Sequence, residues 1–230
     1  MTEDKKRAAD NSALDAITAK TPGGSPVPRL VKRMGASLPH WRRDAATYAV
    51  TFRLADSLPQ AVLVQWKLER EHIIARAEQM ERPLTTFEIQ RLDTLYSERV
   101  EQWLDKGHGS CILRDERFAR LVRDAMLFFD GQRYDLLAWC VMPNHVHSVL
   151  RTYSGHDLSM ILLSWKGFTC KKANVMLGAA GGGTFWQKEP YDHLIRDEAD
   201  LARQIKYVLK NPTAAGLVDW PWVGQKSTSG

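Results

Sequence analysis

Two neighbouring apolar segments with a two-residue turn between them constrain the fold of this chain more than any other feature. Residues 134–142 (YDLLAWCVM) and 145–151 (HVHSVLR) have the composition of β-strands, and the Pro143-Asn144 pair between them is typical of tight turns. Strands joined by such a short connection pair in the antiparallel direction. The sequence therefore predicts a β-hairpin, to which the remaining strands must be added.

The segments on either side of the hairpin predict a ferredoxin-like α+β fold. Residues 46–54 alternate as a strand does, and residues 191–195 could form a short strand. Apolar residues recur at helical spacing in three further segments, which are 115–129, 157–177 and 197–210. The order strand, helix, strand, strand, helix, strand predicts an antiparallel sheet with helices on one face. A C-terminal helix follows, which Asn211-Pro212 should end.

Residues 56–112 are expected to form an inserted helical hairpin between the first strand and the helix that follows it. Helical spacing covers residues 58–80 and 86–106, and Pro83 lies between these two stretches. Thr86 has the side chain of an N-cap for the second helix.

The two ends of the chain are expected to lie outside the folded domain, which we place at residues 41–223. Residues 1–40 have few large apolar side chains and contain a Pro- and Gly-rich run, which predicts a mobile basic tail. Residues 224–230 are expected to be a disordered C-terminus.

The composition excludes several classes of protein. No apolar run of about 18 residues and no signal-peptide pattern occurs, so we expect neither a membrane-spanning nor a secreted protein. Three widely separated cysteines argue against a disulfide framework or a thiolate zinc site and favour a reducing cytoplasm. The net charge of +5 is compatible with a polyanionic partner without identifying one.

His145 and His147 are the first candidate functional residues. Residues two apart on a strand project from the same face, so both imidazoles face one space while Val146 points the other way. That arrangement suits two nitrogen ligands on one metal ion. Histidines on the surface or satisfied within the core are the alternative.

Tyr207 and Asn211 are the second candidates. A step of four residues on a helix places them on one face, so that a phenol and an amide oxygen can converge. The alternative is structural, with Tyr207 in the core and Asn211 as a cap before Pro212.

Taken together, these motifs resemble those of HUH-type single-tyrosine transposases, and more narrowly of REP-associated tyrosine transposases. The resemblance spans about residues 41–223 and rests on several ordered stretches. They are MPNHVH at 142–147, WK at 165–166, FWQ at 185–187, YDHLIRD at 191–197, YVLKNP at 207–212 and AGLV at 215–218.

The resemblance implies transesterification on single-stranded or hairpin DNA. In such enzymes a tyrosine attacks a backbone phosphate and leaves a 5′-phosphotyrosine and a free 3′-hydroxyl. Carried over to this chain, Tyr207 is the nucleophile, His145 and His147 are metal ligands, and Asn211 stands where relatives place a polar third ligand. Such a set suits Mg²⁺ or Mn²⁺, although imidazoles accept zinc equally well.

DNA contacts are expected from basic and aromatic residues near these motifs. The predicted contacts are Arg42, Arg43, Lys166, Lys171, Lys172, Trp186 and His193. Core packing is the alternative for Trp186, and a structural role is the alternative for His193. Tyr191 is the main rival to Tyr207 as nucleophile, because it precedes His193 and could reach the site from a neighbouring strand.

Other functions are open at this point. A replication initiator or relaxase would use the same chemistry, and a DNA-binding protein could have lost cleavage. The inserted hairpin could reshape DNA binding, mediate self-association or contact another protein.

Overall fold

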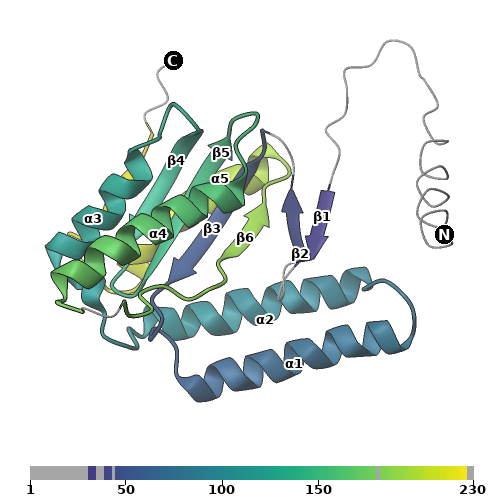
Figure 1. Ribbon diagram of the computed structural model, residues 1–230. Helices are drawn as coiled ribbons and strands as arrows, with labels where there is room; N and C mark the ends of the chain where they lie inside the picture. The colour runs from purple at the N-terminus through teal and green to yellow at the C-terminus, as the bar shows by residue number, and fades with distance from the viewer. Residues whose placement is uncertain (1–30, 35–38, 43–44, 180–181, 227–230) are drawn as a thin grey trace, which may run out of the picture.

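The computed structural model describes residues 31–34, 39–42, 45–179 and 182–226. Five strands form one antiparallel sheet in the order β6-β3-β5-β4-β7 (Figure 1). They are β3 (Thr47–Arg53), β4 (Tyr134–Val141), β5 (His145–Thr152), β6 (Tyr191–Leu194) and β7 (Val223–Gln225). Apart from the inserted hairpin, β3 to β6 follow the chain order of a β-α-β-β-α-β unit, which confirms the predicted fold class.

Helices cover both faces of this sheet. Helices α3 (Glu116–Leu127) and α4 (Leu158–Met176) pack on one face, and α5 (Glu198–Ala214) packs on the other. The two-residue period of β3 separates the layers, because Tyr48 and Val50 join the α3–α4 core whereas Ala49 joins the α5 core. The C-terminal helix thus takes the face that the α3–α4 layer leaves free.

Trp165 of α4 ties three elements together in the larger core. Its side chain is 2% exposed, and its Nε1 donates a hydrogen bond of 2.9 Å to the Tyr134 hydroxyl on β4. That hydroxyl in turn donates to the carbonyl oxygen of Met126 on α3, at 2.6 Å. Both polar atoms are therefore satisfied where burial would otherwise be costly.

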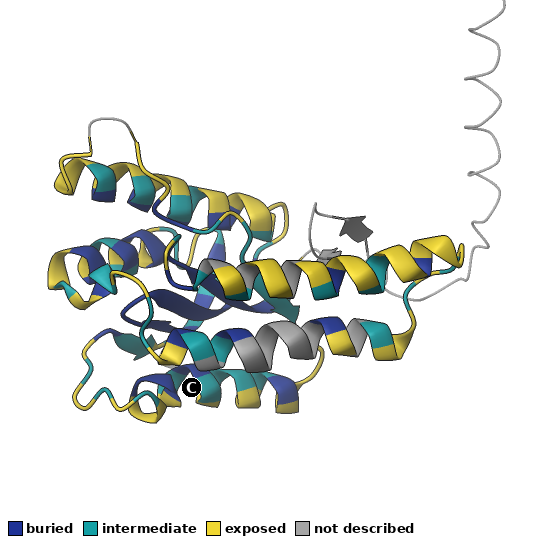
Figure 2. Cartoon of the chain, turned by 90° about the horizontal axis from the view of Figure 1, so that it is seen from below, coloured by how far each residue is buried: buried dark blue, intermediate teal, exposed yellow. Residues whose placement is uncertain are grey.

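The inserted hairpin consists of α1 (Gln60–Gln79) and α2 (Thr86–Asp105), and α2 lies nearer the sheet (Figure 1). Figure 2 shows that most described residues of both helices are exposed or half-buried. The hairpin was predicted with Thr86 as the N-cap, but the cap is Thr85. Thr85 has the extended backbone of a cap and lies three residues before Glu88, as a capping box requires.

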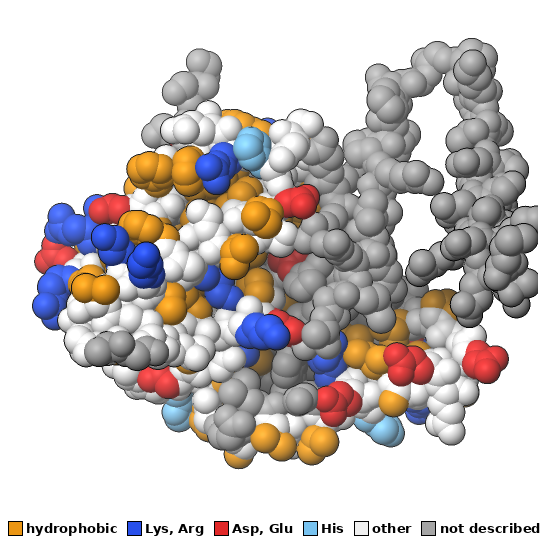
Figure 3. Space-filling view, in the orientation of Figure 1, with side chains coloured by type: hydrophobic (Ala, Val, Ile, Leu, Met, Phe, Trp, Pro, Cys, Tyr) orange, Lys and Arg blue, Asp and Glu red, His pale blue; other side chains and the backbone are white. Residues whose placement is uncertain are grey.

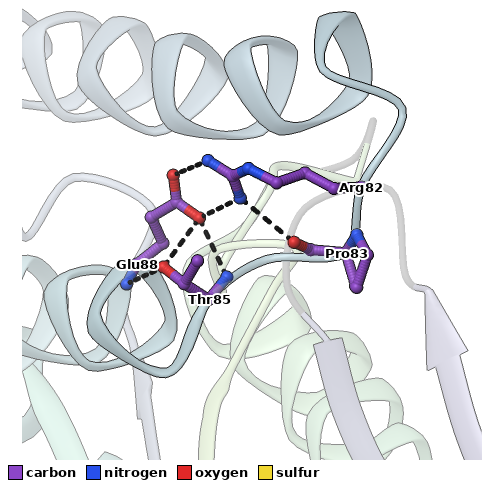
Figure 4. A network of polar contacts seen from close by, with 4 residues as sticks. All are labelled: Arg82, Pro83, Thr85 and Glu88. Atoms are coloured by element: carbon purple, nitrogen blue, oxygen red, sulfur yellow. Dashed lines mark hydrogen bonds and ion pairs between the residues drawn. The ribbon is translucent and has the colours of Figure 1, made fainter.

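Arg82 and the capping box close the distal turn of the hairpin (Figure 4). The Thr85 hydroxyl accepts from the Glu88 backbone N–H at 3.2 Å, and the Glu88 carboxylate accepts from the Thr85 N–H at 2.9 Å. The Arg82 guanidinium donates to both carboxylate oxygens, at 2.7 and 2.8 Å. The turn is therefore held by polar contacts within the hairpin itself.

The predicted end of α5 was wrong, because the helix runs through Pro212 to Ala214. A proline removes one backbone donor and strains the turn before it. Here Asn211 and Pro212 are both buried, so packing against the sheet holds the last turn in place.

Short strands also replace parts of both predicted terminal segments. β1 (Val31–Met34) pairs with β2 (Pro39–Arg42), and β1 lies within the predicted tail. β7 includes residues 224 and 225 of the predicted disordered C-terminus. Neither β1 nor β7 has the apolar alternation that marks a strand in a sequence. No helix in the described ranges is long and apolar enough to cross a membrane.

Candidate active site

His145 and His147 lie on β5 and face α5. Val146 and Leu150, which alternate with them, belong to the core on the opposite face. The side chains of His145 and His147 are 1% and 2% exposed. The two imidazoles therefore share one face of the sheet, as their spacing predicts.

Hydrogen bonds orient both rings. The Nε2 atoms of the two histidines face one another at 2.8 Å. The Nδ1 atom of His145 lies 2.7 Å from Asn144 Oδ1, and that of His147 lies 2.8 Å from the Thr51 hydroxyl. Such partners on the outer nitrogens are typical of histidines that bind metal through the inner ones.

Asn144 connects His145 to the inserted hairpin. Its Nδ2 donates to the carbonyl oxygens of Leu104 at 3.2 Å and His108 at 2.9 Å. The Asn144 Oδ1 atom therefore accepts a hydrogen bond from His145 Nδ1. The proton of neutral His145 thus lies on Nδ1, and the His145 Nε2 atom presents a lone pair. The end of α2 thereby sets the tautomer of a candidate metal ligand.

Both histidines are held neutral. Burial lowers the pKa of His145 well below its usual range, and electrostatic interactions with His147 and Arg53 lower it further. Burial also lowers the pKa of His147, to about 3. Neutral imidazole is the form that binds metal ions.

Tyr207 and Asn211 approach the histidines from α5. The Tyr207 ring meets the His147 ring edge-on, with centroids 5.3 Å apart and an interplanar angle of 82°. Asn211 is buried one turn later on the same helix. Its Oδ1 is buried without a hydrogen-bond partner in the described structure.

This donor set fits a divalent ion. Two nitrogen ligands at about 2.1 Å from one metal lie about 3 Å apart when they meet at a right angle, close to the 2.8 Å between the Nε2 atoms. The unpartnered oxygen of Asn211 could complete the set. The described residues contain no group of three or more His, Cys, Asp or Glu able to hold a metal. A third protein ligand would therefore have to come from a group such as this amide.

Glu101 of α2 also belongs to the site, and sequence reasoning missed it. Glu101 and Tyr207 line the same cavity, and the charge of Glu101 acts on the Tyr207 hydroxyl. Burial raises the pKa of Glu101 to about 7, and burial together with the Glu101 charge raises the pKa of Tyr207. Glu101 stands among the many charged residues of a helix, so no local pattern distinguishes it.

An open cavity of about 700 Å³ lies in front of Tyr207. Its walls come from α2, β6 and α5, and Tyr191 and His193 line it from β6. The lining also includes three basic residues of α5 that sequence reasoning missed, namely Arg203, Lys206 and Lys210. Arg203, Lys206 and Lys210 follow one another at intervals of three and four residues, which places them on one face of a helix. This spacing, next to Tyr207, could have identified them from the sequence.

The His193 side chain is held by Asp200. Its Nε2 lies 2.8 Å from Asp200 Oδ2, and Arg203 donates to the other carboxylate oxygen at 2.8 Å. His193 therefore lines the cavity, where a DNA contact was predicted, and is also held in place by Asp200, as the structural alternative predicted.

Three other predicted DNA contacts lie on α4, across the sheet from Tyr207. Lys171 and Lys172 are exposed there, on the layer seen in Figure 3, where basic side chains mix with exposed apolar ones. Lys166 instead donates to the carbonyl oxygens of Gln187 and Lys188, at 2.6 and 2.8 Å. These bonds give Lys166 a structural role.

The remaining predicted contacts are not brought to the cavity. Trp186 is 4% exposed, and its Nε1 donates to the Thr169 hydroxyl at 2.8 Å, which agrees with its core alternative. Arg42 ends β2, but its side chain and all of Arg43 lie outside the described structure.

Comparisons with known proteins confirm the predicted resemblance. A putative REP-associated tyrosine transposase of Haemophilus influenzae is 29% identical over 101 residues, covering 39% of this chain and 57% of its own. A REP-associated tyrosine transposase of Escherichia coli is 26% identical over 108 residues, covering 45% and 62%. The chain thus spans about three-fifths of the length of these relatives.

A solved structure and the family models complete the comparison. The structure is of a REP-associated tyrosine transposase bound to a REP hairpin. It is 16% identical, with a TM-score of 0.44, and the match covers 87% of this chain and 82% of that one. No protein-family model matches the chain.

Proposed function

We propose that this protein is a transposase-like enzyme that cuts and rejoins single-stranded DNA at hairpins. Tyr207 attacks a backbone phosphate and leaves a 5′-phosphotyrosine and a free 3′-hydroxyl. The observation that carries this proposal is the meeting of Tyr207 with His147 at an open cavity that basic residues line. The similarity to REP-associated tyrosine transposases supports it.

His145, His147 and Asn211 would hold a divalent ion, Mg²⁺ or Mn²⁺. When bound, the ion would polarise the scissile phosphate and neutralise its developing charge. The chain itself contributes orientation, because Asn144 and Thr51 hold the outer nitrogens of the two imidazoles. Because the two imidazoles are fixed and Tyr207 lies on a packed helix, the reacting groups keep a constant relative position.

Basic residues of α5 would bind the DNA backbone beside the nucleophile. Lys206 and Lys210 are exposed, and both line the cavity with Tyr207. Phosphate contacts of this kind dominate binding to single strands and weaken with added salt. Lys171 and Lys172 remain predicted contacts for a part of the DNA that passes the α4 layer.

A covalent adduct tests this proposal. The probe is a 3′-labelled single strand that carries a palindrome from the DNA flanking the gene. We expect wild type to form a denaturant-resistant protein–DNA adduct in Mg²⁺ or Mn²⁺, and Tyr207→Phe to bind the strand without forming one. EDTA and His145→Ala should abolish the adduct, and a fully paired duplex of the same sequence should yield none.

Tyr191→Phe is the matched control, because Tyr191 lines the same cavity. Its adduct should persist. An adduct that survives Tyr207→Phe but is lost in Tyr191→Phe would overturn the assignment of the nucleophile. A wild-type protein that binds the hairpin and never forms an adduct would instead be a DNA-binding protein that has lost cleavage.

A further inference from the structure

Asp200 of α5 is a buried carboxylate that two other side chains share. Its side chain is 7% exposed, and Asp200 does not line the open cavity. Its Oδ2 lies 2.8 Å from His193 Nε2, and its Oδ1 accepts a hydrogen bond from the Arg203 guanidinium at 2.8 Å. His193 and Arg203 both line the cavity. The acidic group therefore lies behind the two side chains that form part of the cavity wall.

Two elements fix the position of this carboxylate. Asp200 lies in the first turn of α5, where its backbone N–H donates to the side chain of the cap residue Asp197 at 2.8 Å. His193 holds the carboxylate from β6. Burial raises the pKa of Asp200, but its hydrogen bond and electrostatic interaction with His193 leave that pKa below its usual range. The carboxylate is therefore ionised and accepts hydrogen bonds from both neighbours.

Arg203 is anchored at one end of its guanidinium and open at the other. Its side chain is 70% exposed, and Nη2 is the atom that bonds to Asp200. Among the described residues, its Nη1 and Nε atoms make no hydrogen bond. A guanidinium presents its donors in a planar fork that binds phosphate oxygens in pairs. An ion pair this exposed adds little to stability, which favours a role in orienting the fork.

The spacing along α5 relates Arg203 to the candidate nucleophile. Arg203 and Tyr207 are four residues apart on this helix, and both line the cavity. Residues four apart lie on one helical face, separated by about 6 Å along the axis. Neighbouring phosphates of an extended single strand have a similar separation. A strand with one phosphate at Tyr207 would thus bring an adjacent phosphate to Arg203.

We propose that Arg203 binds the backbone phosphate next to the one that Tyr207 attacks, and that Asp200, held by His193, is the positioning residue for the Arg203 guanidinium. This inference rests on the proposed function. Lys206 and Lys210 line the same wall, but an ammonium group is a point charge on a flexible stem. The lysines attract the strand without selecting one phosphate, whereas the held guanidinium sets the register of the strand at the nucleophile.

The affinity for the labelled hairpin strand tests the contact. It is measured by fluorescence anisotropy in the Tyr207→Phe protein, so that no strand is cut. Arg203→Gln in this background should weaken binding by about tenfold, because a charged hydrogen-bond donor is lost. Arg203→Lys should restore little of the affinity, because it returns the charge without the fork.

Arg91→Gln is the matched control. Arg91 on α2 also bonds through its Nη2 atom to a carboxylate, that of Glu69 at 3.0 Å, but it does not line the cavity. This variant should bind the strand as tightly as the Tyr207→Phe protein. If Arg203→Gln binds equally tightly, the proposed contact is wrong.

Asp200→Asn separates positioning from simple charge. Removal of a negative charge beside bound DNA should by itself tighten binding. If Asp200 positions Arg203, the variant should instead weaken binding, and Arg203→Gln should cost less in the Asp200→Asn background than without it. Tighter binding would overturn the positioning role. Asparagine keeps the shape and one acceptor oxygen, and circular dichroism checks the fold. If Asp200→Asn does not fold, Arg203→Gln at its exposed position still tests the contact.

A neutral methylphosphonate, placed at each phosphate of the single-stranded segment in turn, locates the contact. Arg203→Gln should weaken binding of every such strand except one, whose substitution lies beside the cleaved phosphate and has already removed the contact. An equal loss at every position would overturn the assignment to a single phosphate. An exception farther along the strand would overturn its placement beside Tyr207.

The two proposals fail separately. The cleaved phosphate is mapped from the wild-type adduct. If wild type forms no Tyr207-dependent adduct, the proposed function is refuted, while the affinities still show whether Arg203 holds one phosphate. A Tyr207-dependent adduct without any phosphate that couples to Arg203 would overturn this inference and leave the proposed function intact.

Discussion

The sheet and the inserted hairpin are stabilised in different ways. Seven of the eight residues of β5 are buried, with helices packed on both faces of the strand. In α1, by contrast, Arg70 and Ala77 are the buried residues among those whose side chains are described. The sheet is held by burial, whereas the hairpin is held by docking at its near end and by polar contacts at its far end. The cost of a substitution should therefore fall from the sheet, through the junction, to the distal turn.

The largest effect is expected at Trp165, in the core between the sheet and α4. Trp165→Ala should lower the free energy of unfolding by about 3–5 kcal/mol, because it removes a large ring and leaves a cavity. Loss of the bond from its Nε1 to the Tyr134 hydroxyl adds to this cost. Urea denaturation followed by tryptophan fluorescence and circular dichroism measures the change.

Phe168→Ala on the same helix is the control. Phe168 is 50% exposed, so its loss should cost much less. Equal destabilisation by the two substitutions would show that burial in this core is not what distinguishes the sheet from the rest of the chain.

The same difference explains which parts of the fold could be predicted from the sequence. The strands at 46–54, 134–142 and 145–151 combine strand composition with burial, so their patterns predicted β3, β4 and β5 closely. The end of α5 was missed because tertiary packing outweighs the local preference of Pro212. β1 and β7 were missed because pairing with a neighbour, rather than an apolar pattern, defines them.

The site divides in the same way. The shared face of His145 and His147 follows from spacing within one strand, and that of Tyr207 and Asn211 from spacing within one helix. Glu101 could not be found by such reasoning, because the cavity that it shares with Tyr207 joins residues 106 positions apart. Local periodicity predicts which residues share a face, but only the fold shows which faces meet.

The second effect is expected at the junction, where Gly109 ends the inserted hairpin. Its φ of +86° is a conformation that L-residues rarely adopt, and an added Cβ would lie 2.5 Å from the Asp56 carbonyl oxygen. Gly109→Ala should therefore destabilise the protein by about 2–4 kcal/mol, more than the strain of the backbone alone. Urea denaturation gives the value, and hydrogen exchange at the Ser110 N–H, which bonds to the Asp56 carboxylate at 2.7 Å, reports the local change.

Gly155→Ala separates strain from close approach. Gly155 has a similar φ of +79°, but an added Cβ there meets nothing within 4 Å. It should cost less than Gly109→Ala. If the two variants are equally stable, contact with Asp56 plays no part in holding the hairpin to the end of β3.

The smallest effect is expected at the distal turn, and it depends on pH. Hydrogen bonds from the Arg82 guanidinium, followed by those from Thr85, lower the pKa of Glu88 from 4.5 to about 2. A carboxyl group whose pKa is lower in the folded protein stabilises it when ionised. That contribution is complete above the pKa of the unfolded chain, near 4.5, and is lost as the pH falls toward 2.

Comparison of wild type with Glu88→Gln across this range tests the polar closure of the hairpin. Above about pH 5, the first turn of α2 should exchange its backbone hydrogens more slowly in wild type than in Glu88→Gln. The difference should shrink as the pH falls from 4.5 toward 2, because a protonated Glu88 resembles glutamine. Exposed Glu78→Gln on α1 should leave exchange in this turn unchanged. A difference that stayed constant down to pH 2 would mean that the charge of Glu88 does not hold the turn. The distal hairpin would then depend on the contacts between α1 and α2, as the sheet depends on its core.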